Sequence, residues 1–224
     1  MVRLLLETAK SYKKFEFEEN SDLKIIGEYA FGCTSIESIT IPKHITKISE
    51  GTFFNCEKFQ EINFHDDCEL KIIDKRSFGF TALQSITIPA SVVELKDKWL
   101  MYVNSEDFDV KIDEKNKQFK YFEDKIIVGK TNPESEEYEN LVFARRSIEN
   151  LKIPPFIKRI APFAFSECKK LESISDHNLS EFIIEKKAFI LSSLNTIKLC
   201  SSKVQMTEGS LIGALNLENV DISD

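Results

Sequence analysis

Apolar residues recur along this chain in a long, fixed order that exceeds the period of a single helix or strand. The segment 26–42 reads IGEYAFGCTSIESITIP, and the same order returns further on. Copies begin at Ile48, Ile73, Ile160, Ile184 and Met206. Most copies carry a phenylalanine at the same position of the pattern. In adjacent copies these equivalent positions are about 22–25 residues apart. These positions are Phe31, Phe53, Phe78, Phe165 and Phe189, with Leu211 last. A repeat of this length predicts a solenoid.

Each copy ends in alternating apolar residues, as at Ile39 and Ile41, which predict a short strand with one buried face. Pro42 removes a donor and ends that strand. The rest of a copy has room for a turn and a short helical or irregular segment. Parallel strands joined by such crossovers coil right-handed. Since no copy can bury its phenylalanine alone, we predict one core shared by neighbouring copies.

The pattern I-x-x-x-A-F-x-x-C-x-x-L-x-x-I-x-I-P resembles the BspA-like leucine-rich repeats, which occur in surface antigens of bacteria and parasitic protists. The resemblance covers roughly residues 15 to 222. Pattern and resemblance together predict an α/β fold, a right-handed leucine-rich-repeat solenoid with short parallel strands and an inserted β-hairpin. For function, the resemblance implies adhesion to host cells and to matrix proteins such as fibronectin.

We expect a single leucine-rich-repeat domain over residues 1–224. Its predicted parts are an amino-terminal cap or partial repeat (1–14), repeats (15–113), a hairpin insertion (114–150) and further repeats (151–224). The apolar runs 126–128 and 141–143 predict the hairpin, with a long mobile tip near residues 133–140. Trp99 and Leu100 stand where alanine and phenylalanine are expected, so that repeat is predicted to be distorted but packed.

The formal net charge of −7 argues against a nucleic-acid partner, because phosphate contacts need clustered lysine and arginine. The first residues, MVRLLLETAKSYKK, contain an apolar run too short for a secretion signal, and no stretch is long enough to span a membrane. These features favour a cytoplasmic location without membrane insertion, whereas the family resemblance favours the cell surface.

The cysteines and histidines show no recognisable catalytic or metal-binding motif. We expect Cys33, Cys56 and Cys168 to be small buried residues of the repeat; a disulfide set or metal site is the alternative, although no C-x-x-C pair exists. The segment His65-Asp66-Asp67 is interpreted as a solvated acidic turn. The sequence therefore predicts a protein without catalytic residues, metal or cofactor.

The residues between the buried positions of the strands should line one outer face, a candidate surface for protein or glycan. They are Ser38, Thr40, Glu61, Asn63, Ser85, Thr87, Ser173, Ser175, Thr196 and Lys198. A second candidate is the acidic hairpin tip, with Glu134, Glu136, Glu137 and Tyr138. The alternative for both is an ordinary solvated surface.

The last strand, with Val220 and Ile222, shows no polar cap. We expect that edge to be covered by a further part of the protein, by a partner or by self-association. Our main hypothesis is a non-enzymatic scaffold that binds protein partners, for example an assembly or cytoskeletal component. The alternative is a cell-surface or secreted adhesin that binds host or matrix proteins.

Overall fold

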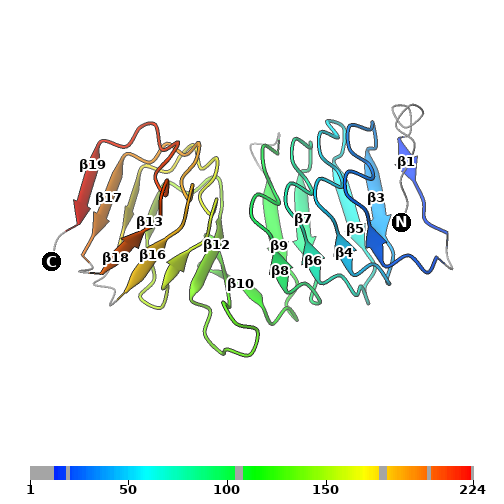
Figure 1. Ribbon diagram of the computed structural model, residues 1–224, viewed down its shortest axis with the longest axis horizontal. Coiled ribbons are helices and arrows are strands. Elements are labelled where there is room, and N and C mark those ends of the chain that lie inside the picture. Colours follow the sequence, from blue (N-terminus) through cyan, green and yellow to red (C-terminus); the bar gives the residue numbers. More distant parts are fainter. Residues whose placement is uncertain (1–12, 19–20, 104–107, 177–180, 201–202, 223–224) are drawn as a thin grey trace. The chain divides into compact units, whose positions relative to one another are not determined.

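The computed structural model describes residues 13–18, 21–103, 108–176, 181–200 and 203–222. Backbone contacts divide the chain into two compact units, Met1–Lys117 and Gln118–Asp224, and each is described by itself. In both units short strands and turns alternate along the chain (Figure 1). The described residues contain no helix, so the helical part of the predicted α/β class is wrong. The single domain and the right-handed coil stay predictions.

The first unit forms parallel sheets in which equivalent strands of successive repeats lie side by side. One row contains the four-residue strands together with the two-residue strand β1, in the sheets β1-β3-β5 and β7-β9. These are β1 (Lys14–Phe15), β3 (Ser38–Ile41), β5 (Glu61–Phe64), β7 (Ser85–Ile88) and β9 (Asp109–Ile112). The other row contains shorter strands: β2 (Ile25–Ile26), β4 (Lys47–Ile48), β6 (Ile72–Ile73) and β8 (Glu94–Leu95).

The second unit repeats this arrangement. The row that corresponds to β3, β5, β7 and β9 of the first unit is a parallel sheet. It contains β13 (Asn150–Lys152), β15 (Ser173–Ser175), β17 (Thr196–Leu199) and β19 (Asn219–Ile222). Its other sheet has the order β10-β11-β12-β14-β16-β18. The strands are β10 (Phe119–Phe122), β11 (Ile126–Gly129), β12 (Asn140–Ala144), β14 (Arg159–Ile160), β16 (Phe182–Ile184) and β18 (Val204–Met206).

The backbone hydrogen bonds around each phenylalanine explain why no helix forms there. The amides of Tyr29, Phe31 and Cys33 donate to carbonyls of the next repeat at 2.8–3.0 Å, while the amides between them close turns three residues back. An α-helix needs bonds four residues back. Positive φ angles at Tyr29 (51°) and Cys33 (60°) bend the chain away from a helical path. The same paired angles recur at Gly51 and Asn55, Arg76 and Phe80, Lys98 and Tyr102, Phe163 and Glu167, Lys187 and Leu191, and Gly209 and Gly213.

The recurring phenylalanines form the centre of the core, as the repeat predicts. Phe53 is fully buried, and its ring stacks on Phe31 at 5.4 Å and on Phe78 at 5.5 Å. In the second unit, buried Phe165 and Phe189 stack at 5.0 Å. Trp99 and Leu100 are also buried, which confirms that the distorted repeat is packed.

The predicted hairpin is confirmed, and it extends a sheet of the second unit. Strands β11 and β12 pair antiparallel, with an irregularity between Ile127 and Val128. Strand β10, which the sequence analysis did not anticipate, pairs antiparallel with the free side of β11. Strand β12 then pairs in parallel with β14, through Leu141 and Ile160. The hairpin is therefore hydrogen-bonded to the strands of the repeats through the pairing of β12 with β14.

The expected burial of one cysteine is wrong. Cys56 and Cys168 are buried, but Cys33 is exposed. The repeat places its small buried residue three positions after the phenylalanine, and in the first copy that residue is Thr34, whose hydroxyl lies 3.5 Å from the Cys56 sulfur. Cys33 instead takes the left-handed position of the turn.

Candidate ligand-binding groove

The outward residues predicted for the first unit lie in register on one strand row. Ser38 pairs with Glu61 and Thr40 with Asn63 across strands β3 and β5. Ser85 and Thr87 occupy the equivalent places on β7. Apart from half-buried Ser38, these side chains are exposed, because the residues between them fill the core. The repeat therefore brings them to one face, and their role in binding stays a prediction.

The second unit carries the remaining predicted residues on its own strand row. Ser173 pairs with Thr196 and Ser175 with Lys198 across β15 and β17. Lys198 is exposed, while the others are half-buried. The Ser173 hydroxyl also donates to the side-chain oxygen of Asn150 on the neighbouring strand at 2.5 Å. Hydroxyls that are already bonded along the row offer fewer free groups to a ligand.

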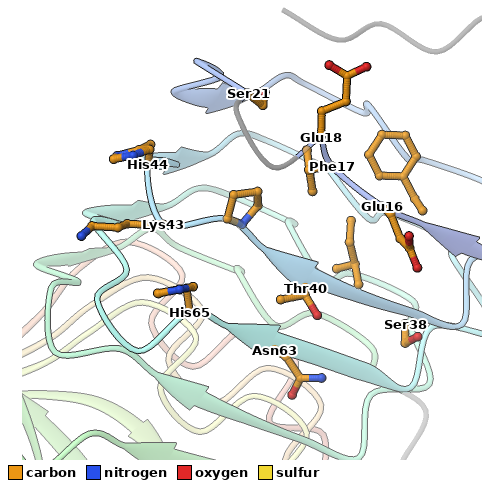
Figure 2. Close-up of a pocket in the computed structure, with 13 residues that line it drawn as sticks. Glu16, Phe17, Glu18, Ser21, Ser38, Thr40, Lys43, His44, Asn63 and His65 are labelled. Atoms are coloured by element: carbon orange, nitrogen blue, oxygen red, sulfur yellow. The ribbon is translucent and has the colours of Figure 1, made fainter.

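A groove of about 740 Å³ lies over the start of the first unit's strand row. Strands β3 and β5 contribute Ser38, Thr40 and Asn63, three of the predicted residues, and Figure 2 shows them along one side of it. The other lining residues are Phe15, Glu16, Phe17, Glu18, Ser21, Ile39, Pro42, Lys43, His44 and His65. The groove opens here because β1 pairs with β3 only through Lys14 and Phe15, and the chain then leaves the sheet.

The basic side of the groove is already paired with carboxylates. The Lys43 ammonium lies 3.7 Å from Asp67, and His44 Nδ1 lies 3.1 Å from Glu69. His65 Nδ1 accepts a hydrogen bond from the Asp67 amide at 3.3 Å. These contacts hold the two turns that carry the basic residues, so little positive charge is left for an anionic ligand.

The acidic side of the groove, formed by Glu16 and Glu18, has no ion pair among the residues that the structure describes. Glu16 and Glu18 are exposed, and no cation of the described chain forms an ion pair with either. Phe17 lies between them in the sequence and is half-buried. In Figure 2, Glu16 extends toward the strand with Ser38 and Thr40, whereas Glu18 points outward. The free charge of the groove is therefore negative.

Sequence reasoning missed Glu16, Phe17, Glu18, His44 and His65 as parts of one site. The segment FEFEE alternates like the strands of the other repeats, and that signal could have placed Glu16 beside Ser38 and Thr40. The histidines gave no such signal, since they lie in turns of different repeats. Only the stacking of successive repeats brings their turns together.

The hairpin tip, the second predicted surface, is partly engaged within the chain. The Lys158 ammonium lies 3.0 Å from Glu137 and 2.8 Å from Glu139. The hydrogen bond from Lys158, followed by one from Thr131, lowers the pKa of Glu139. The Lys120 ammonium sits 4.0 Å from the centre of the Tyr138 ring. Glu134 and Glu136 stay exposed.

Two of the buried thiols, Cys56 and Cys168, have raised pKa values. All five cysteines are free, and burial raises the pKa of Cys168 to about 12. Burial also raises the pKa of Cys56. Thiols with raised pKa values carry little thiolate at neutral pH and are poor nucleophiles. Across the described ranges, no group of three His, Cys, Asp or Glu side chains could hold a metal ion; His177 lies outside them.

No helix long and apolar enough to cross a membrane occurs in the part of the chain that the structure describes. The strand at the carboxyl-terminal end of the second unit, β19, is exposed at every position. Val220 and Ile222 are each about half exposed there. Self-association through this edge stays a prediction.

Comparison with known proteins identifies the repeat. The family model of the BspA type leucine-rich repeat region matches residues 7–106 and 115–224, in six copies. The crystal structure of the pneumococcal vaccine antigen PcpA superposes with a TM-score of 0.71 at 19% identity, covering 93% of this chain and 56% of that one. This chain therefore spans about half the length of that antigen.

A leucine-rich cell surface protein from Faecalibacterium prausnitzii superposes with a TM-score of 0.58 at 20% identity, covering 96% of this chain and 74% of that one. A leucine-rich repeat protein from Eubacterium ventriosum gives 0.54 at 15% identity, with 91% and 71% covered. No curated protein matches the sequence. At these identities the structures show the fold alone, whereas the family match covers most of the chain: this protein belongs to the BspA-type leucine-rich repeat family.

Proposed function

We propose that this protein is a non-enzymatic binding module that holds a protein partner on the strand face of its first unit. The observation that carries the proposal is the groove of about 740 Å³ over strands β3 and β5. Three residues that the repeat alone assigns to the outer face, Ser38, Thr40 and Asn63, line it. Concave sites with a few fixed polar groups are the usual form of a binding site.

The construction of this face supports binding more than chemistry. Thr40 and Asn63 lie on hydrogen-bonded strands whose alternate residues, Ile39 and Ile62, are buried in the core. Such side chains are held in place by the scaffold and lose little entropy when a partner binds. His44 lies 3.1 Å from the Glu69 carboxylate, whereas His65 contacts the Asp67 amide, and within the described residues neither ring contacts a hydroxyl or thiol that could act as a nucleophile. A catalytic base would need an orienting partner and a nucleophile.

A second candidate function is that of a cell-surface or secreted adhesin. It is favoured by the descriptions of the similar structures, a vaccine antigen and a cell surface protein. The free cysteines support the opposite location, because thiols persist in the reducing cytoplasm. Labelling of intact cells, compared with labelling after permeabilisation, decides between the two. A label that reaches the protein only after permeabilisation would refute the adhesin.

The proposed function is tested by blocking the groove. Thr40→Arg places a long side chain over the strand face, and Ser147→Arg places the same side chain on an exposed turn of the second unit. Wild type and both variants are used to capture partners from cells of the source organism by cross-linking. We expect one protein to be captured by the wild type and by Ser147→Arg but not by Thr40→Arg. Equal capture by all three would contradict the proposal.

A further inference from the structure

We propose that the groove of the first unit binds an extended peptide segment that carries an arginine or lysine side chain. This inference rests on the proposed function and specifies the chemistry of the partner. The cationic side chain would lie against Glu16 and the ring of Phe17, with Glu18 at the mouth of the groove. The peptide backbone would lie along Thr40 and Asn63.

The charge of the groove favours a cationic ligand. Lys43 forms an ion pair with Asp67 at 3.7 Å, and His44 is hydrogen-bonded to Glu69 at 3.1 Å. Glu16 and Glu18 have no such partner in the described ranges. A ligand that enters the groove therefore meets uncompensated negative charge, which attracts cations and repels phosphorylated or sulfated chains.

The groove also contains an aromatic ring, that of Phe17, which lies between the two glutamates in the sequence. Phe17 is half-buried and packs edge-on against Phe15, at 5.0 Å between ring centres. Its remaining surface is in the groove lining with Glu16 and Glu18. Aromatic faces attract guanidinium and ammonium groups. Carboxylates beside a ring thus match a long cationic side chain better than a small metal ion, which would require more oxygen ligands.

The size of the groove and the polar side chains of strands β3 and β5 favour an extended peptide. A groove of about 740 Å³ is larger than one side chain needs, so neighbouring residues of the ligand must also lie in it. The Thr40 hydroxyl forms no hydrogen bond within the described chain. Asn63 donates to Glu61 at 2.8 Å and keeps its carbonyl oxygen for a donor. Such groups on a strand suit the alternating donors and acceptors of an extended peptide.

Binding to the full chain is measured with three probes: a short fluorescent peptide of alternating arginine and threonine, the same peptide with glutamate in place of arginine, and a neutral oligosaccharide. The test variant is Glu16→Gln/Glu18→Gln. The matched control is Glu134→Gln/Glu136→Gln on the exposed hairpin tip, which has the same spacing and changes the net charge equally. Thermal unfolding of both variants confirms that they fold.

We expect the arginine peptide to bind the wild type and the control alike, and Glu16→Gln/Glu18→Gln to bind it about tenfold more weakly. Added salt should weaken the wild-type complex more than that of the test variant. Equal loss in both variants, equal binding of the glutamate peptide, or binding of the oligosaccharide alone would overturn the inference. If Thr40→Arg abolishes capture of the natural partner while the arginine peptide fails to bind, the proposed function stands and this inference falls.

Discussion

The two units use the same repeat for the same core but carry different charged side chains on their strand faces. Phe53 and Phe189 occupy equivalent buried positions, one in each unit. On the outer face, the first unit has Glu16, which forms no ion pair within the described residues, and the exposed Lys111, whereas the second has the exposed Lys152, Lys198 and Asp221. The repeat therefore constrains the inward residues and leaves the outward residues free to differ. Function in this fold resides in the outward residues.

The largest difference between the units should appear when a core ring is removed. Phe53 stacks on both sides, at 5.4 Å on Phe31 and 5.5 Å on Phe78, so Phe53→Ala opens a cavity that neighbours cannot fill. We expect a loss of about 4–5 kcal/mol in the free energy of unfolding, against about 3 kcal/mol for Phe189→Ala. Urea denaturation measures the free energy of unfolding of both variants. Hydrogen exchange then shows which unit has lost stability. A larger loss for Phe189→Ala would contradict the comparison.

Replacing turn glycines should cost less stability than removing a core ring. Gly51 has a φ of 62°, and a Cβ there would lie 2.7 Å from Cδ1 of the Tyr29 ring. At Gly209, with a φ of 73°, the nearest atom is the flexible end of Ile212 at 2.9 Å. We expect Gly51→Ala to cost about 2–3 kcal/mol and Gly209→Ala about 1 kcal/mol. Thermal unfolding of the two variants checks the order, and equal costs would show that the ring moves aside freely.

The position before the core phenylalanine holds a buried hydroxyl in some repeats, such as Thr52, and alanine in others, such as Ala30 of the same unit. Thr52 is fully buried, and its hydroxyl donates to the Ser49 carbonyl at 2.8 Å and the Gly27 carbonyl at 3.2 Å. The second unit has Ala164 and Ala188 there. We expect Thr52→Val to cost about 1–2 kcal/mol, since carbonyls lose a donor. Thr52→Ser, which keeps the hydroxyl, should cost less in chemical denaturation; the reverse order would refute this account.

The smallest expected effect is the pH dependence of the hairpin tip. Lys158 lowers the pKa of Glu139 in the folded protein below its ordinary value of 4.5. The ion pair therefore stabilises the fold above that pH, and its contribution is lost as the pH falls through the lowered pKa. Because the Lys158 side chain is 60% exposed and solvent screens the ion pair, we expect only a small change in the free energy of unfolding. Glu139→Gln should remove this part of the pH dependence of unfolding; an unchanged profile would contradict the assignment.

The pattern of buried residues could be predicted from the sequence, because the same core contacts recur in successive repeats. The phenylalanine positions, the short strands and the hairpin all followed from apolar spacing. The absence of helices from the described residues did not follow from apolar spacing. It depends on backbone hydrogen bonds between different repeats, such as that from the Phe31 amide to the Thr52 carbonyl. Strand β10 was missed because its apolar residues, Phe119 and Phe122, do not alternate.

The candidate site was only half predictable. Ser38, Thr40 and Asn63 follow from strand alternation, since each is next to a buried isoleucine of the same strand. The groove also depends on where β1 ends and on how the turns with His44 and His65 stack. Those features depend on contacts between repeats, and no local spacing encodes them.

The central claim is that the strand face of the first unit is the binding surface. Hydrogen exchange of the full chain, with and without its captured partner, tests it most directly. The account predicts slower exchange at residues 16–18, at Thr40 and at Asn63, with no change on strands β15 and β17. Protection confined to the hairpin tip or to the second unit would contradict it.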